Sequence, residues 1–139
     1  MRWSGPDPHG RLPAGTPQNP LRPMSAPLVQ SAALAALLQD GTHRPLLLDC
    51  SFDLADLEAG PWAYAAAHLP GAVYLHLEKD LSGPRTGSNG RHPLPDPGQF
   101  VALLARLGCD DDTPVVAYDN AGGMYAARAW WMLRWVGHA

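Results

Sequence analysis

The sequence predicts an α/β fold in which helices flank a parallel sheet. Residues 46–50 form a continuous apolar run, which is typical of a strand buried on both faces. Segments with apolar residues at helical spacing alternate with such runs along the chain, and this order favours parallel strands. The 139 residues are enough for one domain of ordinary size, and the chain has no internal repeat.

The amino-terminal end differs in composition from the rest. Residues 1–23 are dense in Pro and Gly and have no apolar periodicity, so they cannot bury enough surface to offset their ordering entropy. We predict a disordered extension at 1–23 and assign 24–139 to the domain. Met24 opens a segment typical of a normal start, so a start codon placed too far upstream is an open alternative.

Three strands and a helix are expected in the first half of the domain. We predict a short strand at 28–30, then a helix capped by Ser31 and ended by Gly41. One face of that helix carries Leu34, Leu37 and Leu38. The strand at 46–50 follows, then an irregular or short-helical stretch at 53–67 and a strand at 73–75.

The second half contains the best-marked helix. Asp96 is expected to be its N-cap, with Pro97 at the first helical position, Gln99 at the capping-box position and Gly108 at its end. The polar loop at 79–95 before it is long, and such loops are usually functional or mobile. A strand at 114–118, a loop at 119–124 and a helix at 125–136 complete the pattern.

Charge and composition argue against several classes of function. A net charge of -3 without a Lys/Arg run gives no electrostatic case for nucleic acid or an anionic membrane. No apolar run approaches the roughly 18 residues that span a bilayer, and the start lacks the apolar core of a signal peptide. Cys50, Cys109 and the histidines show no metal or redox spacing, so we expect no metal, no cofactor and a reducing cytoplasm.

Two motifs resemble a known family. Residues 64–75, YAAAHLPGAVYL, place His68 before a Leu-Pro-Gly-Ala turn, and residues 114–138, PVVAYDNAGGMYAARAWWMLRWVGH, form a strand–loop–helix pattern. Both resemble the amino-terminal rhodanese domain of two-domain thiosulfate or 3-mercaptopyruvate sulfurtransferases. In that fold a further strand returns between the first and fourth strands. The resemblance therefore implies a rhodanese-like sheet that is incomplete at the C-terminus, without its last strand and helix.

The loop after the fourth strand is where an active rhodanese holds its sulfur-bearing cysteine, surrounded by backbone N–H groups. The matching position here is Asp119, followed by Asn120, Gly122 and Gly123. Because a carboxylate cannot carry sulfur, the resemblance implies a degenerate loop, no catalytic residue in this chain and a catalytic cysteine in a second domain. Asp119 as an N-cap of the last helix is a compatible structural interpretation.

Neither cysteine is expected to replace the missing nucleophile. Acidic neighbours disfavour the thiolate at Cys50, and the helix C-terminus together with three aspartates disfavours it at Cys109. His68 is expected to bond local backbone. The last helix carries Trp130, Trp131 and Trp135, which we expect in the core and at a domain interface.

The loop at 79–95 carries Arg85, Arg91 and His92. In two-domain members of the family the corresponding loop lies near the interdomain cleft. The resemblance implies that Arg85 and Arg91 meet an anionic sulfur donor or a carboxylate of the second domain. A solvated surface loop is the alternative.

The resemblance implies transfer of sulfane sulfur from thiosulfate or 3-mercaptopyruvate to a thiophilic acceptor, with this chain inactive alone. A non-enzymatic rhodanese-homology module for binding or regulation is the alternative. Dual-specificity phosphatases, which share the fold, need an arginine six positions after their cysteine, and Tyr125 stands there. The loop also fits neither glycine-rich phosphate-binding fingerprint.

Overall fold

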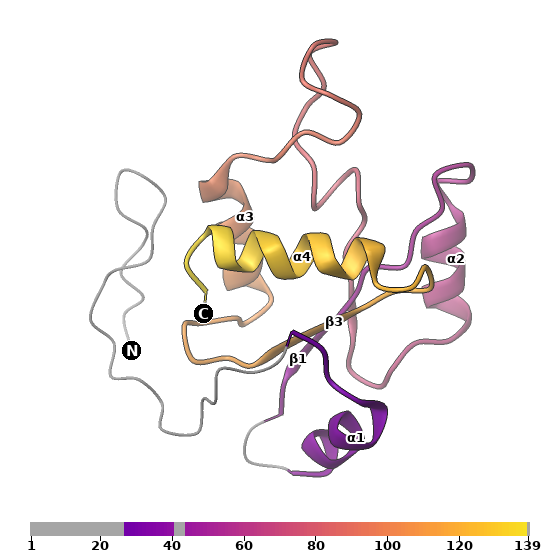
Figure 1. Cartoon of the computed structure of the whole chain (residues 1–139), viewed down its shortest axis with the longest axis vertical. Coiled ribbons are helices and arrows are strands. Elements are labelled where there is room, and N and C mark those ends of the chain that lie inside the picture. The colour runs from indigo at the N-terminus through magenta and orange to yellow at the C-terminus, as the bar shows by residue number, and fades with distance from the viewer. Residues whose placement is uncertain (1–26, 41–43, 139) are drawn as a thin grey trace.

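The computed structural model describes residues 27–40 and 44–138. In chain order its elements are α1 (Ser31–Gln39), β1 (Leu46–Asp49), α2 (Ala59–Ala66), β2 (Val73–Tyr74), α3 (Pro97–Arg106), β3 (Val115–Tyr118) and α4 (Met124–Trp135) (Figure 1). The predicted α/β class is confirmed. The extension expected at 1–23 lies outside the described residues.

The sheet has the order β2–β1–β3, and both pairs of strands are parallel. The central strand, β1, is the continuous apolar run, and its Leu47 and Leu48 are fully buried. Its last residue, Asp49, pairs with Tyr74 of β2 and Tyr118 of β3. The segments that follow β1 and β3 therefore leave the sheet at the same edge.

Two helices, α3 and α4, share a buried core with the sheet. Figure 1 shows α4 lying across β1 and β3, with α3 beside it. Leu48 of the sheet, Phe100 of α3 and Met132 of α4 belong to one buried cluster. This packing fixes the start of α4, and hence the loop before it, relative to the sheet edge.

The boundaries of α3 are as predicted. The Asp96 side chain accepts a hydrogen bond from the backbone N–H of Gln99 at 3.1 Å, and Pro97 is the first helical residue. Phe100 and Leu104 are buried on the inner face. Gly108 follows the helix with φ +78°, a conformation that favours glycine.

The strand predicted at residues 28–30 is wrong. These residues are exposed, and no strand of the described chain lies beside them to complete a hydrogen-bonded ladder. Ser31 is also not an N-cap: it is the first residue of α1, and Gln30 takes the cap position without a side-chain hydrogen bond. None of the α1 residues is buried, so its leucines provide little packing. The predicted end at Gly41 lies outside the described residues.

Two of the three tryptophans of α4 lie outside the core, and their place at a domain interface stays a prediction. Trp130 and Trp131 are 43% and 47% exposed, because Ala129, Met132 and Leu133 take the buried face of the helix. Trp135 is half-buried and stacks on Trp131 with ring centroids 5.9 Å apart. None of the helices in the described ranges has the length and apolarity needed to cross a bilayer.

Candidate functional site

The loop between β3 and α4 folds back toward its own first residue. It begins at Asp119, directly after β3, and ends at Gly123, the residue before α4. Gly122 and Gly123 have φ +69° and +91°, in the left-handed region that residues with a Cβ rarely adopt. Two such residues in succession turn the backbone N–H groups toward the side chain of Asp119.

The Asp119 carboxylate accepts four backbone hydrogen bonds. Oδ1 accepts the N–H groups of Ala121 and Gly123, both at 2.8 Å. Oδ2 accepts those of Tyr125 at 2.7 Å and Ala126 at 2.8 Å. The last two belong to the first turn of α4, where N–H groups have no partner within the helix. Asp119 thus caps α4 from four positions before the N-cap residue, Gly123.

These hydrogen bonds decide the charge of Asp119. Burial alone would raise its pKa, but the four N–H donors outweigh burial and lower the pKa below its ordinary value. The carboxylate is therefore ionised at neutral pH. The loop has the architecture of an anion site at a helix start, and the anion it holds is its own side chain.

Asn120 ties this loop to the segment that follows β1. Its side-chain Oδ1 accepts a hydrogen bond from the backbone N–H of Phe52 at 3.3 Å. Asp119, Asn120, Gly122 and Gly123 therefore form one structural unit at the carboxyl edge of the sheet, bounded on one side by residues 50–54.

Both cysteine thiols are buried and poorly ionisable. Burial, and then the charges of Asp49, Asp119 and Asp80, raise the pKa of Cys50 to about 12. Burial, and then Asp110 and Asp111, raise the pKa of Cys109 to about 11. Thiols in such surroundings are almost wholly protonated at neutral pH and are weak nucleophiles.

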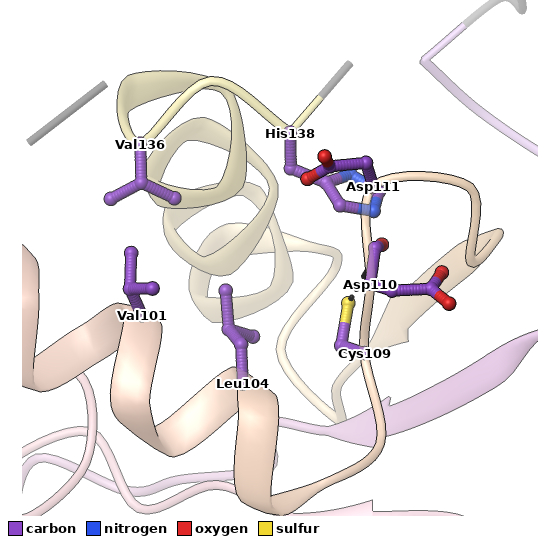
Figure 2. A pocket seen from close by; sticks show the side chains of 7 residues that line it. All are labelled: Val101, Leu104, Cys109, Asp110, Asp111, Val136 and His138. Carbon is purple, nitrogen blue, oxygen red and sulfur yellow. Dashed lines mark hydrogen bonds between the residues drawn. The ribbon is translucent and has the colours of Figure 1, made fainter. Parts of the chain in front are cut away.

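Cys109 does border a small cavity. Val101, Leu104 and Val136 line it with apolar side chains, while Asp110, Asp111 and His138 lie at its rim (Figure 2). Its volume of about 20 Å³ suffices for roughly one water molecule. No sulfur donor fits there.

His68 has the structural contacts expected of it. Its Nδ1 lies 2.7 Å from the carbonyl oxygen of Tyr64, and its ring stacks on the Tyr64 ring at a centroid distance of 3.9 Å. The turn that follows is fixed by Arg44, which donates a hydrogen bond to the carbonyl of Pro70 at 2.9 Å. These contacts hold the entry into β2 and include no reacting group.

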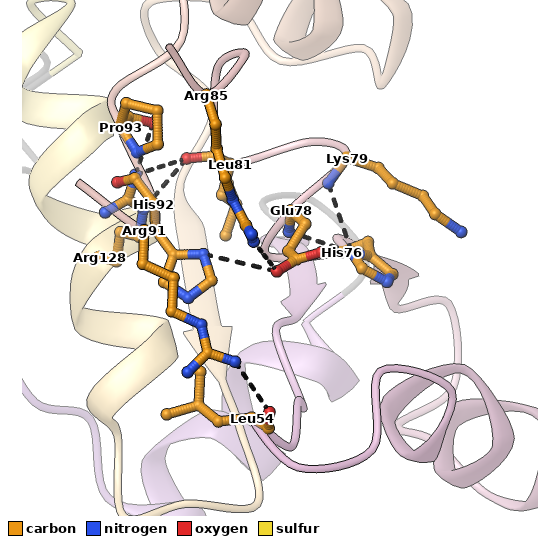
Figure 3. A network of polar contacts seen from close by, with 10 residues as sticks. All are labelled: Leu54, His76, Glu78, Lys79, Leu81, Arg85, Arg91, His92, Pro93 and Arg128. Atoms are coloured by element: carbon orange, nitrogen blue, oxygen red, sulfur yellow. Dashed lines mark hydrogen bonds and ion pairs between the residues drawn. The ribbon is translucent and has the colours of Figure 1, made fainter. Parts of the chain in front are cut away.

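The arginines of the loop at 79–95 have different partners (Figure 3). Arg85 forms an ion pair with Glu78, so its charge is neutralised within the loop. Arg91 donates a hydrogen bond to the carbonyl oxygen of Leu54 at 3.1 Å and forms no ion pair with any residue that the structure describes. The structure thus brings Arg91, but not Arg85, against the segment that follows β1.

His92 is partly buried without a hydrogen bond. Neither ring nitrogen has a hydrogen-bond partner in the described chain, and Nδ1 lies 3.9 Å from a carboxylate oxygen of Glu78. Burial lowers the pKa of His92, and the nearby arginines add to this, while Glu78 opposes it. The imidazole is therefore neutral at pH 7.

The residue that holds this loop in place is Arg128 of α4, which the sequence analysis missed. Its Nε and Nη2 donate to the carbonyl oxygen of Leu81 at 3.0 and 2.9 Å. Nη2 also donates to the carbonyls of His92 at 3.0 Å and Pro93 at 3.3 Å. Both ends of the loop are thereby fixed to α4 (Figure 3). A charge three positions after the buried Tyr125 was the available signal, because a half-buried guanidinium needs partners.

The charges of Arg91 and of Asp119 both act on the phenol of Tyr125. Burial raises its pKa, the charges of Asp53 and Asp119 raise it further, and Arg91 opposes them. All three charged groups are thus close enough to act on one phenol. Within 27–40 and 44–138, no group of three or more His, Cys, Asp or Glu side chains is placed to hold a metal ion.

Comparison with known proteins gives consistent matches. The family described as the rhodanese-like domain matches residues 30–139. The probable 3-mercaptopyruvate sulfurtransferase of Pseudomonas aeruginosa is 46% identical over 114 residues, which cover 81% of this chain and 39% of that protein. The thiosulfate sulfurtransferase of Cricetulus griseus is 35% identical over 115 residues, with coverage of 80% and 38%.

A solved structure agrees with the sequence matches. The 3-mercaptopyruvate sulfurtransferase from Leishmania major superimposes with a TM-score of 0.63 at 30% identity, covering 71% of this chain and 28% of that one. The chain spans just under two fifths of the length of the two curated relatives. The predicted resemblance is confirmed, and the chain belongs to the family of rhodanese-like domains.

Proposed function

We propose that this chain is the amino-terminal part of a sulfurtransferase that moves sulfane sulfur from thiosulfate or 3-mercaptopyruvate to a thiophilic acceptor. The cysteine that carries the sulfur as a persulfide belongs, in this proposal, to a second rhodanese domain. The relatives named above are thiosulfate and 3-mercaptopyruvate sulfurtransferases, which supports the reaction class.

One observation supports placing the sulfur-carrying cysteine in a second domain. The four N–H groups that would stabilise a persulfide anion in this loop are already bonded to the Asp119 carboxylate. A second anion in the same place would meet like-charge repulsion and would have no free donors. Asp119 thus stands in the position of the nucleophile, and its carboxylate occupies the N–H donors that a persulfide would need.

Arg91 is the residue of this chain that we assign to the donor or to the second domain. It is exposed, it has no ion-pair partner among the described residues, and it lies beside the segment after β1. A guanidinium in that situation attracts a carboxylate or thiosulfate and orients it through paired N–H donors. Arg85, held by Glu78, serves the shape of the loop instead.

A chimera tests the proposal. Residues 30–138 of this chain would replace the matching segment of the Pseudomonas aeruginosa relative, and sulfur transfer from 3-mercaptopyruvate to cyanide would be measured. We expect a folded, active chimera, and a substantially raised KM when Arg91→Ala is introduced into it. Arg85→Ala serves as the matched control and should alter KM less.

A folded chimera without activity would contradict the proposal. It would favour the non-enzymatic rhodanese-homology module, for which the filled Asp119 loop is equally suitable. Equal effects of the two arginine substitutions would contradict only the assignment of Arg91.

A further inference from the structure

A cavity of about 260 Å³ lies between residues 79–82, which follow β2, and α3. Its lining includes Lys79, Ser82, Gln99, Leu103 and Arg106. None of its lining residues belongs to the Asp119 loop or to residues 50–54, so it is separate from the site described above. Its volume is slightly below the roughly 300 Å³ at which small-molecule pockets begin.

The rim of this cavity carries two cations without counter-ions. The side chains of Lys79 and Arg106 form no ion pair or hydrogen bond within the described part of the chain. The Lys79 side chain extends away from Glu78 and from its neighbours Arg85 and His92 (Figure 3). The position of Arg106 in the last turn of α3 is favourable for the helix dipole, but the dipole does not account for Lys79.

One carboxylate also lines the cavity, and it is already engaged. Asp80 Oδ2 accepts the backbone N–H of His76 at 2.7 Å. Two cations against one carboxylate leave the cavity with a net positive charge, which favours an anionic occupant.

The lining of the cavity is mixed: it includes apolar side chains and one polar group without a partner. Among its apolar residues Pro95 and Phe100 are buried, and the half-buried Leu103 gives an occupant an apolar contact. The hydroxyl of Ser82 is buried without a hydrogen-bond partner, and such a group costs about 1–3 kcal/mol while it stays unpaired. Rotation of this hydroxyl toward an occupant would satisfy it.

We propose that this cavity binds a small organic carboxylate, with the carboxylate between Lys79 and Arg106 and the apolar body against Leu103. Binding in this cavity is independent of sulfur transfer. A molecule that is only anionic would leave Leu103 uncovered, and one that is only apolar would leave both cations without a partner.

An NMR titration of the 139-residue chain tests this, with benzoate as the probe. We expect saturable amide shifts confined to residues 79–82 and 95–106 at millimolar benzoate. Benzamide, which lacks the charge, and inorganic phosphate, which lacks the apolar body, should bind at least several-fold more weakly. Added salt should weaken benzoate binding, because the cations are exposed.

Substitutions identify the groups responsible. Because an exposed ion pair contributes up to about 1 kcal/mol, Lys79→Gln and Arg106→Gln should each weaken benzoate binding by up to about fivefold. Arg134→Gln, an exposed arginine elsewhere on the surface, is the matched control and should bind benzoate unchanged. Unaltered binding in the Lys79→Gln/Arg106→Gln double variant, equal binding of benzamide, or the absence of saturable shifts would overturn the proposal.

Discussion

Asp119 Oδ2 accepts the backbone N–H of Tyr125 at 2.7 Å, across six positions of the chain. Tyr125 stands where a phosphatase of this fold would carry its arginine, and its N–H is one of the free donors at the start of α4. This hydrogen bond therefore has two effects. It stabilises the helix, and it removes a donor that an external anion would use.

Replacing Asp119 by Asn should destabilise the domain. The amide keeps one acceptor oxygen but turns an NH₂ group toward two backbone donors, so we expect a loss of about 1–3 kcal/mol in the free energy of unfolding. Urea denaturation at pH 7 measures it. Asp112→Asn, at an exposed carboxylate in another loop, is the control and should change stability by less than about 0.5 kcal/mol.

The difference in stability between the wild type and Asp119→Asn should also depend on pH. The pKa of Asp119 is lowered in the folded state, so its contribution is complete above the unfolded pKa of about 3.9. The contribution is lost as pH falls through the lower, folded value. The stability difference between the wild type and Asp119→Asn should therefore shrink below about pH 4. A difference that is constant down to pH 2 would contradict the assigned charge.

Replacing Asp119 by Cys should produce an activated thiol. The free N–H groups of the loop and of the α4 N-terminus favour a thiolate, so the thiol pKa should fall below the ordinary value of about 8.5. The pH dependence of iodoacetamide alkylation measures it, with Ser88→Cys in an exposed loop as the control. Cys50 and Cys109 should stay silent, because burial raises their pKa to about 12 and about 11. An Asp119→Cys pKa above that of the control would show that the loop does not favour anions.

Replacing Arg128 by Ala should release the loop at 79–95. The carbonyls of Leu81, His92 and Pro93 would lose their donor, and we expect a destabilisation of about 2–4 kcal/mol. Trypsin should then cut faster after Arg85 and Arg91 under native conditions.

Two further variants separate the loss of the Arg128 hydrogen bonds from a general loss of stability. Arg128→Lys keeps the charge but loses the forked geometry, so its cleavage rate should lie between those of wild type and alanine. Arg134→Lys, next to an exposed tryptophan, should leave cleavage in the loop unchanged. Equal protection of the loop in all variants would show that Arg128 does not hold it.

The imidazole of His92 should titrate below the usual value of about 6.5, because burial and the arginines disfavour its charged form. The unfolded chain binds the proton more readily, so this group's contribution is complete above pH 6.5 and falls as pH drops toward the folded pKa. Proton NMR of the ring measures the midpoint. Since Glu78 opposes the shift, Glu78→Gln should lower the midpoint further. An unchanged or raised midpoint in that variant would contradict the assigned environment.

Features encoded over a few residues were predictable from the sequence. The Asp96 cap is local, because its donor belongs to Gln99. The apolar run at β1 identified the central strand. The prediction of a strand at 28–30 was wrong because a strand needs a neighbouring strand, and the sequence pattern carries no information about pairing.

In the candidate site, too, contacts between residues close in the sequence were predictable, and contacts between distant residues were not. The position of Asp119 after a strand and before glycines indicated a capped helix start, since its donors lie within seven residues. Arg128 was missed because its acceptors are 35 to 47 residues away in the chain. The different fates of Arg85 and Arg91 also depend on tertiary contacts, with Glu78 and Leu54 respectively.

Intact-mass spectrometry after incubation with thiosulfate tests the central claim most directly. The 139-residue chain would be treated at neutral pH, freed of donor and weighed before and after addition of cyanide. With Asp119 in the anion loop and both thiols buried, we predict an unchanged mass. A gain of one sulfur atom that cyanide removes would contradict the account.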